Sequence, residues 1–140
     1  MVDARAPGLA ARYRKLRYEI QFRRLPTYRT AAGFTITGDP GFDQSRDGSG
    51  ERTLFLTEVR SSDLLVDIGA NVGYFSLLAS VEGVPVLAIE PDPRNVQLLL
   101  RNIARNQQDD RVEVLPVAIG DRKGILTLFG GGQGASLVKG

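Results

Sequence analysis

The sequence has 140 residues, of which 42% are hydrophobic and 24% are charged, a balance typical of one folded domain rather than a disordered chain. It contains no cysteine and no histidine, which excludes disulfide bonds, thiol nucleophiles, histidine bases and zinc sites built from these residues. No apolar run reaches the roughly 18 residues of a membrane span, and no apolar stretch of a secretory signal follows the first charges. We therefore expect a cytoplasmic protein that holds no metal.

The net charge of +2 is unevenly distributed along the chain. Residues 1–30 carry eight basic residues against Asp3 and Glu19, which gives this segment +6 and leaves −4 for the rest. A basic arm of this kind can contact nucleic acid, acidic lipid or an acidic partner. A helix with a solvated charged face has the same composition, and we favour that interpretation, with nucleic acid kept as the less favoured partner.

Residues 1–50 are predicted to form an extension ahead of the main domain. A basic helix is expected over residues 9–25, because apolar and aromatic residues recur there at helical spacing, and Pro26 ends it. Residues 33–50 combine a short alternating apolar piece with many turn formers. This pattern predicts a strand or a hairpin followed by a loop.

Helices and strands alternate from residue 51 onward, starting with a short helix over 51–60. The expected later elements are strands over 63–69, 84–89, 112–118 and 125–129, and helices over 71–81 and 93–106. This alternation predicts an α/β fold, a Rossmann-like parallel sheet with flanking helices. Because the apolar runs of the strands are nearly continuous, we expect the strands to be buried on both faces.

The two main helices have predicted boundaries and buried faces. Asp92 is expected to cap the second helix, with Pro93 at its first position. The expected buried faces are Val72, Phe75, Leu78 and Ala79 in the first helix, and Val96, Leu99, Leu100 and Ile103 in the second. Tyr74 is expected to be structural rather than part of a pocket, and Asn95, Asn102 and Asn106 are assigned no role.

The stretch VDIGANVG, residues 66–73, joins the first long strand to its helix. Gly69 allows a sharp turn, and Gly73 lets the backbone pass close to a ligand or to a neighbouring element. The following helix directs its N-terminal amides and the positive end of its dipole toward this place. Glu90 ends the next strand, where a carboxylate can accept two hydrogen bonds from a ribose diol.

The same stretch does not fit a phosphate site. The dinucleotide pattern G-x-G-x-x-G requires a glycine where Asn71 stands, and no Gly-Lys-Ser/Thr follows as in a P-loop. Asp67 would repel a pyrophosphate and attract a cationic amino-acid group. The turn therefore favours a ligand with a ribose and a positive charge, as in S-adenosylmethionine. The alternative is a purely structural turn, in which Asp67 caps the helix and Asn71 stabilises the turn.

Three blocks, VDIGANVGYFSLLAS, AIEPDPRNVQLLLRNIARN and VEVLPVAIGDRKG, together resemble class I S-adenosylmethionine-dependent methyltransferases, in particular the FkbM type. The resemblance covers residues 51–138 and implies a cofactor-binding domain over residues 51–140. Members of this family usually continue with a further core strand and the acceptor half of the sheet. The resemblance therefore implies that this chain corresponds to the N-terminal half of the fold.

The resemblance also implies the positions of the cofactor contacts. Asp67, Gly69, Ala70, Asn71 and Gly73 would contact the methionine part, Glu90 the ribose hydroxyls, and Pro91, Asp92 and Ala118 the adenine. At Ala118 many methyltransferases instead have an aspartate that meets the adenine amino group. No catalytic residue is assigned, since the sequence offers no histidine and no compelling carboxylate as a base.

The implied activity is methyl transfer from S-adenosylmethionine to a hydroxyl of a small molecule or saccharide. Two alternatives stay open: an NAD-type oxidoreductase, against which Asn71 counts, and a non-catalytic nucleotide-fold module that binds nucleic acid through the basic arm. A sheet that ends in an exposed strand favours pairing with another chain, so a homodimer is also considered.

Overall fold

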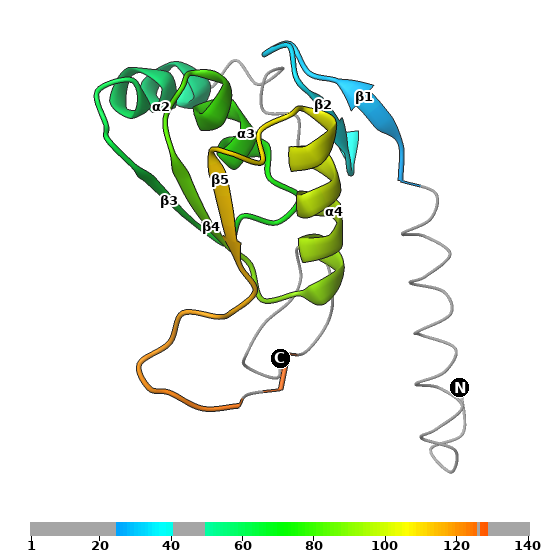
Figure 1. Ribbon diagram of the computed structural model, residues 1–140, viewed down its shortest axis with the longest axis vertical. Helices are drawn as coiled ribbons and strands as arrows, with labels where there is room; N and C mark the ends of the chain where they lie inside the picture. The colour runs from blue at the N-terminus through cyan, green and yellow to red at the C-terminus, as the bar shows by residue number, and fades with distance from the viewer. Residues whose placement is uncertain (1–24, 41–49, 126, 129–140) are drawn as a thin grey trace.

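The computed structural model describes residues 25–40, 50–125 and 127–128, which form an α/β fold with two sheets (Figure 1). The larger sheet is parallel with the strand order β3-β4-β5, and β1 and β2 form an antiparallel hairpin. The elements are β1 (Thr27–Arg29), β2 (Thr35–Thr37), α2 (Glu51–Val59), β3 (Leu65–Ile68), α3 (Tyr74–Val81), β4 (Val86–Ile89), α4 (Pro93–Arg105) and β5 (Val112–Leu115). The predicted α/β alternation with a parallel sheet is confirmed.

The core lies between one face of the parallel sheet and helices α3 and α4. Leu65, Val86 and Val112 are neighbours across the three strands, and their side chains point toward these helices. The buried cluster on this side includes Leu77, Leu78, Ala79, Val86, Ala88, Leu99, Ile103 and Val112. Figure 1 shows α4 lying along this face, with the hairpin beside its C-terminal end.

The opposite face of the sheet is open within the described part of the chain. Val66 is 46% exposed, Ile68 is 65% exposed and Leu115 is 36% exposed. The prediction that the strands are buried on both faces is therefore wrong for β3 and β5. The reason is that α3 and α4 cover the same face, which leaves every second residue of these strands uncovered.

The β1–β2 hairpin contributes to the same core. Phe34 is 3% exposed and Ile36 is 1% exposed, and both belong to the buried cluster. The ring of Tyr74 meets Phe34 edge-on at a centroid distance of 5.5 Å, which confirms that Tyr74 is structural. The predicted hairpin is present, although β1 lies ahead of the range predicted for it. The basic helix predicted over residues 9–25 falls outside the described residues, except for its last position.

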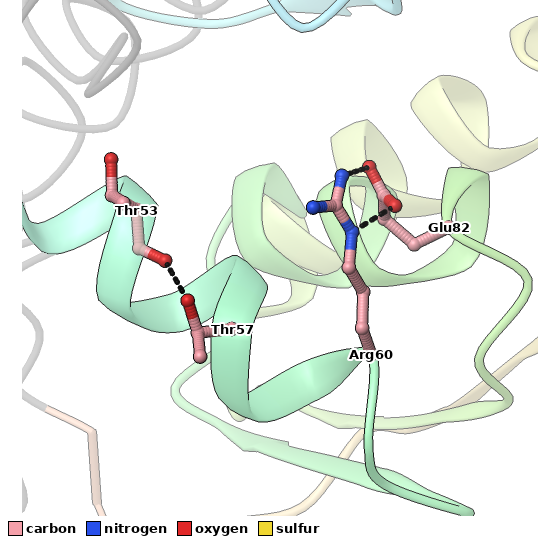
Figure 2. Close-up of polar contacts among 4 residues, drawn as sticks. All are labelled: Thr53, Thr57, Arg60 and Glu82. Carbon is pink, nitrogen blue, oxygen red and sulfur yellow. Dashed lines mark hydrogen bonds and ion pairs between the residues drawn. The ribbon is translucent and has the colours of Figure 1, made fainter.

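Helix α2, predicted over residues 51–60, packs beside α3. The ring of Phe55 lies 4.8 Å from that of Phe75, and Val59 is buried. Arg60, which ends the helix, donates from Nε and Nη2 to both carboxylate oxygens of Glu82 at 2.7 and 3.1 Å (Figure 2). These hydrogen bonds hold the pKa of Glu82 below its ordinary value and raise the pKa of Arg60. Because the pair is exposed to solvent, it orients the two helix ends more than it stabilises the fold.

Helix α4 begins as predicted, with Pro93 at its first position and the side chain of Asp92 accepting from the amide of Arg94 at 2.9 Å. Its buried face differs from the predicted one. Leu100 is 51% exposed, whereas Asn95, Leu98, Leu99, Asn102 and Ile103 are buried. Asn95 and Asn102 lie on the buried side of the helix, at helical spacing. The buried side is therefore centred one residue earlier in the sequence than the side predicted from the apolar residues alone.

The chain after β4 and α4 is less regular than predicted. The strand expected over 112–118 ends at Leu115, and the strand expected over 125–129 is absent from its described positions, where Ile125 is fully exposed. Within the described residues the sheet consists of β3, β4 and β5 alone, and the segment around Ile125 pairs with neither of its outer strands. Across the described ranges, no helix has the length and hydropathy needed to cross a membrane.

Candidate cofactor-binding site

The turn after β3 lies against the carboxyl end of β4. The amides of Gly69 and Ala70 both donate to the carbonyl of Ile89, at 2.8 and 3.0 Å. The amide of Glu90 in turn donates to the carbonyl of Leu115 at 3.1 Å. These bonds place the predicted site residues that follow β3 and β4 at one edge of the sheet, where α/β folds bind their ligands.

Three residues of the turn have a left-handed backbone. The φ angles are +80° at Gly69, +53° at Asn71 and +93° at Gly73, and asparagine is one of the few side chains that tolerates this region. A β-carbon built at Gly69 would meet nothing within 4 Å, whereas one at Gly73 would lie 2.5 Å from Cδ1 of Leu99. Gly69 therefore borders open space, while Gly73 is the position where α4 approaches the backbone.

Glu90 lies at the centre of the site and is 4% exposed. Its Oε2 accepts from the amide of Asn71 at 2.8 Å, and its Oε1 accepts from the amide of Asp92 at 2.9 Å and from Nδ2 of Asn95 at 3.2 Å. The carboxylate thus joins the glycine turn to the start of α4. A carboxylate has about four acceptor positions, and the described residues occupy three of them, which leaves one on Oε2 for the predicted contact with a ligand hydroxyl.

Asp67 is half-buried beside the turn. Its Oδ2 accepts from the hydroxyl of Ser76 at 2.6 Å, and the backbone amide of Ser76 also donates to the carboxylate. Gly73, at the N-terminus of α3, has no side chain to cap the helix, so Asp67 supplies the cap from the preceding strand. The capping alternative considered for Asp67 is therefore realised.

The electrostatic environment of Asp67 favours a cation next to it. Burial raises the pKa of Asp67, the negative charge of Glu90 raises it further, and the hydrogen bonds from Ser76 oppose both effects. A positive group bound at the site would favour the ionised carboxylate and so reverse part of this shift.

The polar groups at this edge fit S-adenosylmethionine better than a pyrophosphate. The amides of Gly69, Ala70, Asn71 and Gly73 all donate to acceptors of the protein, so they do not cradle phosphate oxygens. Two carboxylates face the site instead, which argues against an NAD-type ligand. Asp67 is suited to hold the cationic amino-acid part and Glu90 a ribose hydroxyl, and the bound sulfonium would supply the electrophilic carbon. These protein groups would hold and orient the cofactor.

The remaining predicted contacts follow the ends of β4 and β5. Pro91 is half-buried, and Asp92 is 4% exposed, with its side chain used to cap α4. Ala118 is exposed in the irregular segment after β5. The contacts of these residues with adenine stay predictions, as do the cofactor contacts of the glycine turn.

Three polar residues that sequence reasoning did not assign to the site support it. Ser76 holds Asp67, Asn95 holds Glu90, and Nδ2 of Asn102 donates to the carbonyl of Val72 at 2.8 Å. A signal for the asparagines exists in the sequence, since both fall within the apolar arc of an amphipathic helix. Polar groups in such a position require buried partners.

Comparison with known proteins places the chain within a family. The sequence model described as the TRM5/TYW2 methyltransferase domain matches residues 42–125. One curated relative, the 31-O-demethyl-FK506 methyltransferase FkbM of Streptomyces tacrolimicus, is 39% identical over 70 residues, which are 49% of this chain and 26% of the relative. A second, the tRNA(Phe) (4-demethylwyosine(37)-C(7)) aminocarboxypropyltransferase of Pyrococcus horikoshii, is 36% identical over 63 residues, 44% of this chain and 23% of the relative.

The solved structures agree with the fold. The structure of TYW2 from Pyrococcus horikoshii in complex with MeSAdo is 27% identical, has a TM-score of 0.58, and is matched over 71% of this chain and 38% of that one. The chain spans about a quarter of the length of the two curated relatives. The family match covers β3 through β5 and therefore the whole candidate site. The chain belongs to the TRM5/TYW2 methyltransferase domain family, which confirms the predicted class of S-adenosylmethionine-dependent methyltransferases and its cofactor.

Proposed function

We propose that this chain is the cofactor-binding part of an S-adenosylmethionine-dependent methyltransferase that modifies a nucleotide of tRNA. The observation that carries the proposal is the family match over residues 42–125, together with the tRNA-modifying relative from Pyrococcus horikoshii. The +6 charge of residues 1–30 supports it, because a cluster of lysine and arginine attracts the phosphate backbone of RNA.

Methyl transfer is an in-line displacement at the sulfonium. A lone pair of the acceptor forms a bond to the methyl carbon, the carbon–sulfur bond breaks with its electrons moving to sulfur, and the acceptor loses a proton. The products are the methylated acceptor and S-adenosylhomocysteine. Because the sulfonium is a good leaving group, holding the reactants in line can supply much of the acceleration. The rigid turn and its two carboxylates suit that task.

The same sulfonium also carries the aminocarboxypropyl group that the Pyrococcus relative transfers, according to its name. Attack at that carbon would leave methylthioadenosine rather than S-adenosylhomocysteine. The nature of the product therefore identifies the transferred group. We favour methyl transfer, since the matched family is described as a methyltransferase domain.

The test uses S-adenosylmethionine labelled at its methyl carbon, incubated with the protein and mixed tRNA. We expect label in the tRNA and S-adenosylhomocysteine in solution. Release of methylthioadenosine would contradict methyl transfer. Label that appears only in small hydroxyl acceptors would contradict the tRNA substrate. Replacing Arg12, Arg14 and Arg17 by glutamate should weaken tRNA binding and its salt dependence while leaving S-adenosylhomocysteine binding unchanged.

The second candidate is methylation of a hydroxyl in a small molecule or saccharide, as in enzymes of the FkbM type. It is favoured by the 39% identity over 70 residues to the FkbM methyltransferase. Both candidates require the same cofactor site and differ only in the acceptor. A competition between tRNA and small polyhydroxy compounds for the labelled methyl group separates them.

The cofactor affinity should depend on pH through Asp67. Because the pKa of Asp67 in the free chain is raised from 3.8 and a bound cation lowers it again, binding releases a proton near that pKa. The affinity for S-adenosylmethionine should therefore rise with pH from about pH 4 through the raised pKa and then level off. In the free chain the sign is opposite: the stability due to Asp67 is present at low pH and is lost as the pH rises through the raised pKa.

The variant Asp67→Asn should bind the cofactor roughly tenfold more weakly at neutral pH, since a hydrogen bond to a charged group is lost. It should also lose the pH dependence in this window, as measured by calorimetric titration. Asp63→Asn, at an exposed position before β3, is the matched control and should keep both. An unchanged pH profile in Asp67→Asn would show that Asp67 acts only as a helix cap.

A further inference from the structure

Two asparagines of α4 bind the edge of the hairpin in the same way. Oδ1 of Asn102 accepts from the amide of Thr37 at 2.8 Å, and its Nδ2 donates to the carbonyl of Thr37 at 3.1 Å. One helical turn later, Asn106 accepts from the amide of Thr35 at 2.8 Å and donates to its carbonyl at 2.6 Å. The two side-chain amides thus make the backbone hydrogen bonds that a neighbouring strand would make with the outer edge of β2.

The two asparagines differ in one further contact. Nδ2 of Asn102 also donates to the carbonyl of Val72, in the middle of the glycine turn, at 2.8 Å. The second donor bond of Asn106 instead returns to the carbonyl of Asn102 in its own helix, at 2.7 Å. Asn102 is fully buried, so its hydrogen bonds are shielded from water. Of the two asparagines, only Asn102 therefore links the hairpin to the turn.

The hairpin also touches the turn directly. A β-carbon built at Gly38, which follows β2, would lie 3.1 Å from Cγ2 of Val72. Val72 is thus held at its carbonyl by Asn102 and bounded at its side chain by the end of the hairpin. The preceding residue, Asn71, has a left-handed backbone and is held through its amide by Glu90. The middle of the turn is therefore held by Glu90 at Asn71 and by Asn102 and the hairpin at Val72.

We propose that Asn102 is a positioning residue that transmits the packing of the β1–β2 hairpin to the glycine turn and so determines cofactor affinity. This inference rests on the proposed cofactor site at that turn. Loss of the link that Asn102 makes between Thr37 and Val72 should weaken cofactor binding. Asn106 shares the hairpin contacts of Asn102 but should have no such effect.

The experiment compares Asn102→Ala with Asn106→Ala in the full chain, at a temperature where circular dichroism shows both to be folded. Calorimetric titration with S-adenosylhomocysteine should show binding weakened roughly five- to tenfold in Asn102→Ala and by less than about twofold in Asn106→Ala. Hydrogen exchange measured by NMR should accelerate at the amides of Asn71 and Gly73 in the first variant only. Equal effects of the two variants, or none from Asn102→Ala, would overturn the proposal.

A second variant changes the direct contact between the hairpin and the turn. Gly38→Ala keeps Asn102 and forces Val72 to move by a few tenths of an ångström, so it should weaken binding and accelerate exchange at the same two amides. Gly124→Ala is its control, since a β-carbon there meets nothing within 4 Å and its backbone is not left-handed. If Asn102→Ala does not fold, Gly38→Ala decides the question. If the unsubstituted chain binds no S-adenosylhomocysteine, the cofactor site fails, and hydrogen exchange alone decides whether Asn102 holds the turn.

Discussion

Replacing Glu90 by glutamine is expected to lower the free energy of unfolding by about 1–3 kcal/mol, although the two side chains have nearly the same shape. Three buried donors converge on the two carboxylate oxygens, from Asn71, Asp92 and Asn95. Glutamine offers one acceptor oxygen and one NH2 group, so at least one donor must face another donor. Two donors lie on Oε1 and one on Oε2, so the amide group should turn its NH2 toward Asn71.

This orientation makes a loss of cofactor binding part of the same prediction. The backbone amide of Asn71 is the bond by which Glu90 holds the glycine turn, and its loss should weaken S-adenosylhomocysteine binding roughly tenfold or more. Glu90→Ala should weaken binding at least as much, because it removes both carboxylate oxygens, including the Oε2 position predicted to accept from the ribose. Urea unfolding and calorimetric titration measure the two effects.

The control is Glu113→Gln, an exposed position on β5 whose carboxylate accepts from no buried donor of the described residues. It should change neither stability nor binding. If Glu90→Gln is as stable as the unsubstituted chain, the three donors must find other acceptors, and Glu90 does not organise the turn. If stability falls while affinity is kept, the ribose contact predicted from the resemblance is wrong.

The order of the elements could be predicted from the sequence because each signal is local. The turn after β3 follows an apolar run directly, and the cap of α4 needs only Asp92 and Pro93 next to each other. The two carboxylates could also be placed at one edge, since parallel strands bring their carboxyl ends together. The part of the site built from these neighbours was therefore accessible without the structure.

The remaining features depend on contacts that the sequence does not encode locally. Whether Val66 and Ile68 are buried depends on what covers the second face of the sheet, and the apolar run carries no information about that. The short strand β1 gives almost no periodic signal within three residues. The hydrogen bonds of Asn102 reach residues 65 and 30 positions away in the sequence, so no local pattern distinguishes a positioning asparagine from a solvated one.

Asp67 illustrates a limit of a different kind. The sequence supports both a helix cap and a contact with a cationic cofactor, and these alternatives appeared to compete. The structure shows the carboxylate capping α3 through Ser76 while the side chain stays partly exposed beside the turn, so capping does not exclude a contact with the cofactor. The capping bonds fix the orientation in which the carboxylate would meet the cofactor.

Gly73→Ala should be among the most destabilising single substitutions in the glycine turn. The φ angle of +93° disfavours any β-carbon by about 1–2 kcal/mol, and contact with Cδ1 of Leu99 at 2.5 Å should add about 1–3 kcal/mol of overpacking. Gly83→Ala is a matched control, because its φ of +90° is nearly the same and nothing lies within 4 Å of the added carbon. The difference between the two variants in urea unfolding isolates the contact with α4.

The same contact can be tested by relieving it. Leu99→Ala alone should lower the free energy of unfolding by about 2–5 kcal/mol, since Leu99 is fully buried. In a chain that already carries Gly73→Ala, the same substitution should lower it by less, because the shorter side chain at position 99 leaves space for the added β-carbon. Additive effects would contradict this coupling. If Gly73→Ala and Gly83→Ala cost the same, glycine at position 73 is required for its backbone conformation alone. The approach of α4 would then not explain the residue, and its predicted contact with the cofactor would become the stronger reason for a glycine there.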